Sequence, residues 1–153
     1  MRATTHIRHA VMAGSLLALL ANAPAVNAEQ FVAHGDYEVH YNAFNSTFLE
    51  PDVAESYGLT RSKTLALINV SVLQKQADGG KQAVTAVVTG SASNLIGQSE
   101  ELSFKEIREA DALYYIGGLR FAGEQRLRIS LDVQPDPNQA PYSIQFEQTF
   151  YPE

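Results

Sequence analysis

The chain has 153 residues, a formal net charge of −6 at neutral pH and no cysteine. The lack of cysteine excludes disulfides and a lipoprotein anchor, and the acidic balance disfavours nucleic acids and anionic membranes as partners, because both attract basic surfaces. Soft copper(I) sites are disfavoured as well, since Met1 and Met12 are the only methionines and both stand near the N-terminus.

Residues 1–28 have the pattern of a secretory signal peptide. Arginines stand at its beginning, a 12-residue apolar run ends at Ala21, and small residues precede a cleavage position after Ala28. A helix that crosses a bilayer needs about 20 apolar residues, so this run predicts a cleaved signal rather than a membrane span. We therefore expect a periplasmic or secreted protein with one mature domain, residues 29–153.

Alternation of apolar and polar side chains with a period of two dominates the mature chain and predicts β-strands. The first such segment, residues 31–43, places Val39 and Tyr41 on an apolar face, with His34 and His40 on the polar face of the same strand. Residues 64–73 are apolar on both faces, which is typical of a central strand. Seven segments are expected as strands: 31–43, 64–73, 83–92, 101–107, 112–121, 126–134 and 142–151.

Turn residues separate these segments, and no helix alternates regularly with the strands. Asp78 and Gly79 predict a hairpin turn, and Gly117 inside a strand predicts a bulge or a close backbone approach. We expect an all-β fold: an antiparallel β-sandwich of immunoglobulin-like architecture with about seven strands. A small closed barrel is the alternative, because sequence alone does not set the order of the strands.

One short helix is expected between the first and second predicted strands, within "HYNAFNSTFLEPDVAESYGLTRSK" at residues 40–63. Pro51 suits the first helical position and Gly58 suits the left-handed residue after the last turn. A helix of about two turns is unstable alone and must dock on the sandwich. Its expected anchors are the apolar side chains Phe48, Leu49, Val53 and Tyr57.

Two interpretations of this crossover are open. In the favoured one it plugs one open end of the sandwich, since large apolar residues mostly serve cores. In the other, "NAFNSTF" and "RSK" frame a groove for a partner, with Phe48, Tyr57, Arg61 and Lys63 as binding residues.

The segment "GDYEVHYNAFNSTFLEPDVAESYGLTRSKTLALINVSVL", residues 35–73, resembles the signature of a family of small exported bacterial proteins, domain of unknown function 4426. The resemblance continues through "FKEIREADALYYIGGLRF" to "FEQTFYP" at the C-terminal end. It implies export and a single domain. It implies no activity, cofactor or catalytic residue.

Candidate chemistry is sparse. His34 and His40 could bind a metal if they share a strand face, but a solvated polar face is the more ordinary interpretation. No G-x-S-x-G turn or phosphate-binding glycine loop is present, so no catalytic residue and no cofactor are expected. Asn45 and Asn69 begin glycosylation-like triplets, which we interpret as chance matches. Three arginines, at positions 120, 126 and 128, could form a ladder but are better interpreted as a solvated face.

We therefore expect a non-enzymatic binding or assembly module, with an envelope protein as candidate partner and no nucleic acid. The contact would be strand addition at a sheet edge or docking beside the crossover. The alternative function is a metal or small-ligand carrier that uses His34 and His40.

Overall fold

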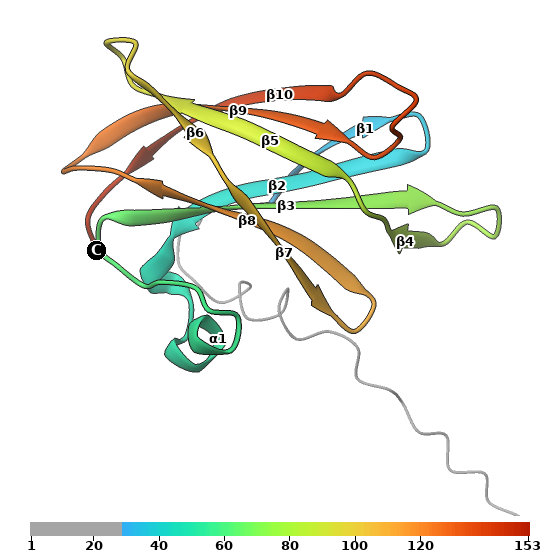
Figure 1. Ribbon diagram of the computed structural model, residues 1–153, viewed down its shortest axis with the longest axis horizontal. Helices are drawn as coiled ribbons and strands as arrows, with labels where there is room; N and C mark the ends of the chain where they lie inside the picture. The colour runs from blue at the N-terminus through green and yellow to red at the C-terminus, as the bar shows by residue number, and fades with distance from the viewer. Residues whose placement is uncertain (1–28) are drawn as a thin grey trace, which may run out of the picture.

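The computed structural model in Figure 1 describes residues 29–153, and the predicted signal peptide at residues 1–28 lies outside the described residues. Ten strands form two stacked antiparallel sheets in this part of the chain, which confirms the predicted β-sandwich. The strands are β1 (Gln30–His34), β2 (Tyr37–Asn45), β3 (Leu65–Lys75), β4 (Lys81–Ala83), β5 (Val87–Ser93), β6 (Ser99–Leu102), β7 (Phe104–Glu109), β8 (Ala112–Arg120), β9 (Gln125–Gln134) and β10 (Tyr142–Phe150). A 3-10 turn η2 (Ser46–Phe48) and the helix α1 (Pro51–Ser56) connect β2 to β3.

The large sheet has the strand order β1-β2-β3-β8-β7, with β4 paired to one end of β3, and the small sheet has the order β10-β9-β5-β6. Side chains join β2 to the C-terminal strand of the other sheet. Gln148 Nε2 donates to the carbonyl oxygen of Ala43 at 2.9 Å, and Asn45 Nδ2 donates to that of Tyr151 at 2.6 Å. These bonds tie the two layers together beside the crossover.

Ten strands appear where about seven are expected, because three predicted strands are each divided in two. Residues 31–43 form the hairpin β1–β2, which turns at Gly35 with φ +58°. Residues 83–92 and 101–107 each contain a point where the chain leaves one sheet for the other. At the first of these, the hydroxyl of Tyr115 accepts a hydrogen bond from the backbone N–H of Ala86 at 2.9 Å.

The main core lies between the sheets. Every second residue of β9, from Leu127 to Val133, is buried, which confirms the predicted alternation. Ile68 of β3 and Ile129 of β9 are fully buried on the facing layers. Burying each side chain of this size stabilises the fold by roughly 1.5–3 kcal/mol.

Gly117 gives the close approach that the sequence predicts. Phe104 is its partner on β7, and its ring lies against the glycine: a Cβ placed on Gly117 would come 2.9 Å from Phe104 Cε1. The predicted turn at Asp78 and Gly79 is also present, with Gly79 at φ +85°.

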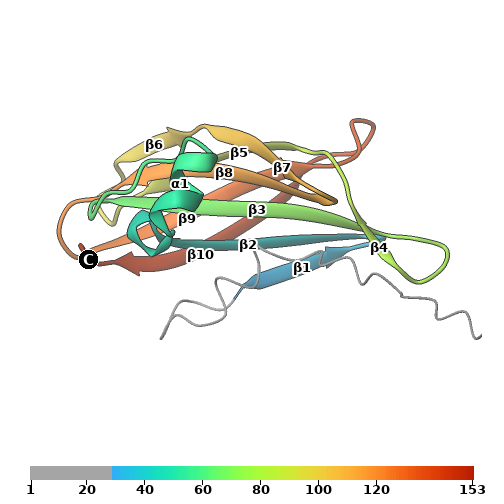
Figure 2. The ribbon, with the colours of Figure 1, turned by 90° about the horizontal axis from the view of Figure 1, so that it is seen from below.

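The crossover covers the outer face of the large sheet instead of plugging an end of the sandwich (Figure 2). A second apolar cluster lies on that face, separate from the main core, and Leu49, Tyr57 and Leu59 pack against it. Its buried members are Phe44, Leu67, Ile107, Tyr114 and Ile116. The strand β3 therefore has apolar cover on both faces, in agreement with its expected central position. Within residues 29–153, no helix has the length and apolar character needed to cross a membrane.

Candidate functional site

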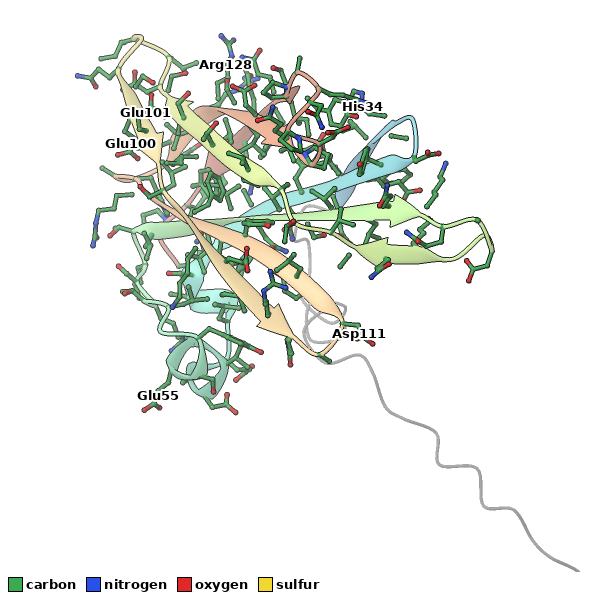
Figure 3. All side chains as sticks on the ribbon, turned by 45° about the vertical axis from the view of Figure 1, so that its right-hand side comes forward. His34, Glu55, Glu100, Glu101, Asp111 and Arg128 are labelled. Atoms are coloured by element: carbon green, nitrogen blue, oxygen red, sulfur yellow. The ribbon has the colours of Figure 1, made fainter. Side chains whose placement is uncertain are left out.

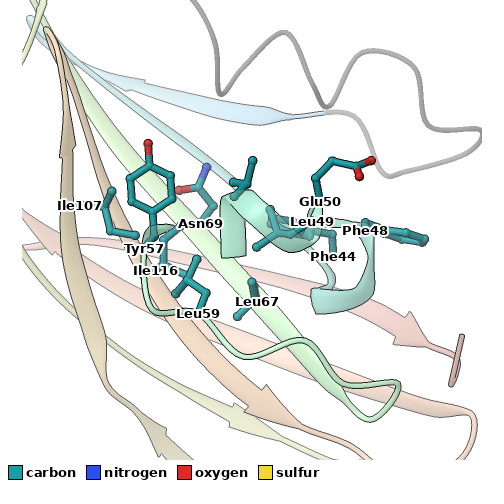
Figure 4. A pocket seen from close by; sticks show the side chains of 11 residues that line it. Phe44, Phe48, Leu49, Glu50, Tyr57, Leu59, Leu67, Asn69, Ile107 and Ile116 are labelled. Atoms are coloured by element: carbon teal, nitrogen blue, oxygen red, sulfur yellow. The ribbon is translucent and has the colours of Figure 1, made fainter. Parts of the chain in front are cut away.

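An apolar pocket opens between the crossover and the outer face of the large sheet, and we call it the α1 pocket (Figure 4). Its cavity has a volume of about 60 Å³. Eleven residues line it: Phe44, Phe48, Leu49, Glu50, Val53, Tyr57, Leu59, Leu67, Asn69, Ile107 and Ile116. Glu50 and Tyr57 are the only ionisable residues among them, so the pocket is built to exclude water from an apolar group.

Local sequence signals explain how the crossover forms the outer wall of this pocket. Pro51 stands at the beginning of α1, where its missing N–H needs no partner. Beyond the last helical residue, Ser56, Gly58 adopts φ +62° and donates its N–H to the carbonyl oxygen of Glu55 at 3.1 Å. Lys105 of β7 donates to the carbonyl oxygen of Tyr57, which fastens the end of the helix to the sheet. These features confirm the predicted helix.

Asn69 lines the pocket, and a second asparagine lies beside it on the neighbouring strand. Asn42 of β2 and Asn69 of β3 are partners across the two strands, and each is 8% exposed. The Oδ1 atom of each is buried and accepts no hydrogen bond from any described residue. A buried polar atom without a partner is unfavourable, so this pair is unusual in a face that is otherwise apolar or paired.

Two tyrosines near the pocket are neutral at physiological pH. Burial, followed by the nearby carboxylate of Glu109, raises the pKa of Tyr57 above its ordinary value of 10.0. The same two causes raise the pKa of Tyr114. Neither hydroxyl therefore supplies a negative charge to the site.

The four binding residues suggested by the sequence divide between the pocket and its surroundings. Phe48 and Tyr57 line the pocket, and Phe48 remains 41% exposed at the surface. Arg61 lies outside the lining and donates to the carbonyl oxygen of Thr47 at 3.0 Å. Lys63 is exposed and is not among the lining residues. The predicted groove therefore exists in part, without its basic end.

His34 and His40 do not share a face, contrary to the pattern assumed for a single strand. The turn at Gly35 makes His34 the partner of Tyr37, and His34 stacks on Tyr142 at 4.2 Å between the ring centres. His40 points to the outer face, where its Nε2 lies 3.2 Å from a carboxylate oxygen of Glu38. Figure 3 shows His34 at the side of the molecule away from Glu55 on α1, and so away from the α1 pocket.

The three arginines do not form the alternative arrangement, a ladder, because β8 and β9 belong to different sheets. Arg126 and Arg128 of β9 both bind Glu147 of β10, at 2.5 and 2.9 Å. Arg120 lies in the large sheet and is exposed. The two paired arginines lower the pKa of Glu147, Arg128 having the larger effect.

The sequence patterns do not identify Asn42, Asn69 or the residues of the inner pocket wall as parts of a binding site. One signal was available, because asparagine is disfavoured in strands and Asn69 interrupts the apolar run of β3. The wall residues Ile107 and Ile116 carry no such signal, since an apolar residue in a strand is equally consistent with the main core.

Comparisons with known proteins place the chain in a family. The family described as "Domain of unknown function (DUF4426)" matches residues 31–153. A crystal structure of a DUF4426 family protein from Pseudomonas aeruginosa PAO1 is 34% identical, with a TM-score of 0.70 and coverage of 82% of this chain and 96% of that one. A search of curated proteins gives no match.

FetP from uropathogenic Escherichia coli strain F11 shares the fold. Its as-isolated structure is 14% identical, with a TM-score of 0.57 and coverage of 80% of this chain and 93% of FetP. A copper-bound variant of FetP is also 14% identical, with a TM-score of 0.56 and coverage of 80% and 95%. A sequence identity of 14% shows a shared fold, and it does not show a shared function. The match over residues 31–153 and the 34% identical structure show that the chain belongs to the DUF4426 family.

Proposed function

We propose that this DUF4426 protein is an exported, non-enzymatic binding protein that holds an apolar group in the α1 pocket. The observation that carries the proposal is the pocket itself: a concave apolar site with one buried amide, placed beside an exposed aromatic side chain, Phe48. Binding sites for small groups typically combine an apolar wall with a few polar atoms that fix orientation.

A binding role fits the pocket better than catalysis does. Acid–base catalysis needs titratable groups that converge on one point, and the pocket offers Glu50 at its lining and a neutral Tyr57. The two histidines of the described residues lie elsewhere, on opposite faces of the large sheet. The proposal therefore assigns no catalytic residue.

Export to the periplasm is part of the proposal and is supported by the pattern of residues 1–28. The intact mass of the protein recovered from the envelope should correspond to a chain that begins at Glu29. A mass that retains the N-terminal segment would contradict cleavage.

Affinity capture from envelope extract tests the binding function. Phe48→Ala removes an aromatic wall of the pocket, whereas Arg61→Ala changes an exposed residue of the same crossover that is not among the pocket lining. A partner should be captured by the wild type and by Arg61→Ala and lost by Phe48→Ala. Equal capture by all three proteins would exclude the pocket and favour a sheet edge as the contact.

A metal carrier is the second candidate, supported by the fold that the chain shares with copper-bound FetP. His40 would be the anchor, since carboxylate oxygens of Glu38 and Glu29 lie 3.2 and 3.4 Å from its two ring nitrogens. However, no group of three metal-binding side chains is positioned around one point within residues 29–153. Titration with copper(II) or zinc while following the ring signals of His34 and His40 by NMR decides this alternative, and unmoved signals would end it.

A further inference from the structure

Resting on the proposed function, we infer that the group held in the α1 pocket is the apolar body of a small neutral amphiphile. Its polar end donates a hydrogen bond to Asn69, and Asn42 is a second acceptor beside it. The ligand class is therefore an aliphatic or aromatic group that ends in a hydroxyl or an N–H.

The amide oxygens of the two asparagines have no hydrogen-bond donor among the described residues. Oδ1 of Asn42 and Oδ1 of Asn69 are buried, and neither accepts a hydrogen bond within the described part of the chain. Nine-tenths of each residue is removed from solvent. Buried acceptors almost always have a partner, so two unpaired ones on neighbouring strands point to a donor that residues 29–153 do not supply.

Asn69 lines the α1 pocket, and Asn42 is its direct partner across β2 and β3 (Figure 4). Side chains in such pairs stand about 5 Å apart, so the head of one ligand can reach both. On the side toward α1, Phe44 and Leu67 follow the asparagines on the same two strands and form apolar wall.

Polarity therefore changes along the strands in one direction. From Phe44 and Leu67 the outer face passes to the two asparagines, and then to Ser71 and His40. A ligand that matches this order has its apolar part under the crossover and its donor at the asparagine pair. A wholly apolar ligand would leave the amide oxygens unpaired.

The charge of the pocket lining and the size of the cavity restrict the class of ligand further. Glu50 is in the pocket lining, so a carboxylate or phosphate head would lie near a like charge, whereas a neutral head would not. The cavity has a volume of about 60 Å³, so it takes a short apolar group, and the rest of a ligand would lie at its open mouth. It would not admit a helix of a partner protein.

A matched pair of probes tests the inference by titration calorimetry of the purified protein. 4-Butylphenol carries a donor on an apolar body, and 4-butylanisole has the same body with the donor replaced by a methyl ether. We expect the phenol to bind about tenfold more tightly than the ether, because one neutral hydrogen bond in a dry site has about that effect on affinity.

The variant Asn69→Leu removes the first acceptor and keeps a side chain of similar size. It should lose most of the preference for the phenol, Asn42 being the acceptor that remains, whereas the control Leu95→Ser, in the exposed β5–β6 turn, should keep the wild-type preference. Equal affinity of the wild type for the two probes, or a preference that is undiminished in Asn69→Leu, would contradict the hydrogen bond from the ligand to Asn69 without contradicting the apolar pocket. If neither probe binds, the proposed function falls and the inference falls with it.

Discussion

Ser46 and Ser62 fasten the two ends of the crossover through a reciprocal pair of hydrogen bonds. Ser46 Oγ donates to the carbonyl oxygen of Ser62 at 3.0 Å and accepts from its backbone N–H at 2.8 Å. Ser46 is fully buried and directly follows β2, and Ser62 stands shortly before β3. This pair closes the loop that forms the outer wall of the α1 pocket.

Replacing Ser46 with alanine should lower the free energy of unfolding by about 2 kcal/mol, because two backbone groups of Ser62 lose a buried partner. Urea unfolding measures the change. Ser56→Ala is the control, since Ser56 is exposed on α1 and its hydroxyl bonds only to the carbonyl oxygen of Asp52. Its effect should stay within about 0.5 kcal/mol. Equal stability of the two variants would show that the Ser46 bonds are not needed.

Gly117→Ala should destabilise the protein by about 1–3 kcal/mol, because the added Cβ would overlap the ring of Phe104. The matched control is the next residue. A Cβ on Gly118 meets its nearest atom, Leu65 Cδ1, at 3.5 Å, which is ordinary contact. Gly118→Ala should therefore be neutral or slightly stabilising. Thermal or urea unfolding of the two variants should separate them, and identical curves would contradict the close approach.

Glu38 should make stability depend on pH in the acid range. Hydrogen bonds from Lys81 and then His40 lower the pKa of Glu38 below its ordinary value of 4.5. A carboxyl whose pKa is lower in the folded state contributes stability above its unfolded pKa, and that contribution disappears as the pH falls through the folded pKa. Stability attributable to Glu38 should thus be present at pH 7 and decline below about pH 4.5.

The variant Glu38→Gln should lose stability less steeply on acidification than the wild type, as measured by urea midpoints between pH 7 and pH 3. Glu100→Gln is a suitable control, because Glu100 is exposed and forms no ion pair within residues 29–153. Parallel pH profiles for the wild type and Glu38→Gln would argue against the pairing of Glu38 with Lys81.

Asn69→Leu should raise the free energy of unfolding by about 1 kcal/mol, because it removes a buried acceptor that has no partner among residues 29–153. Asn45 is a matched comparison: it is also a buried strand asparagine, but its side chain donates to the carbonyl oxygen of Tyr151. Asn45→Leu should therefore destabilise the protein. A gain in stability at Asn69 together with a loss of binding is the signature expected of a residue kept for function. If Asn69→Leu is the less stable of the two variants, its oxygen must have a partner in the free protein.

The sequence predicts side-chain orientation within a strand better than it predicts the ends of strands. Alternation in β9 correctly identifies its buried face, from Leu127 to Val133. The same alternation continues in the sequence through the turn at Gly35, where the chain reverses direction. Odd-numbered residues point inward after the turn, whereas even-numbered residues point inward before it. Phe31 therefore looks like a core residue but is 58% exposed, while Tyr37 packs against the main core.

Local rules suffice for the short helix but not for the surface that it covers. Pro51 and Gly58 identify the two ends of α1 because their effects act within a few residues. Which face of which sheet the helix meets depends on strand pairings far apart in the chain, such as Leu67 with Gly118. The unpaired state of Asn42 and Asn69 has the same origin. It depends on which atoms the finished fold brings near them, and no local pattern contains that information.

The most direct test of the account is an amide NMR titration of the protein with 4-butylphenol. The central claim is that the outer face of the large sheet, beneath the crossover, holds an apolar group. It predicts that the largest chemical-shift changes fall on Leu67, Asn69 and Ile116, with little change at Leu95 and Ile96 of the exposed β5–β6 turn. Shifts centred on that turn or on a sheet edge, or a spectrum that does not change, would contradict it.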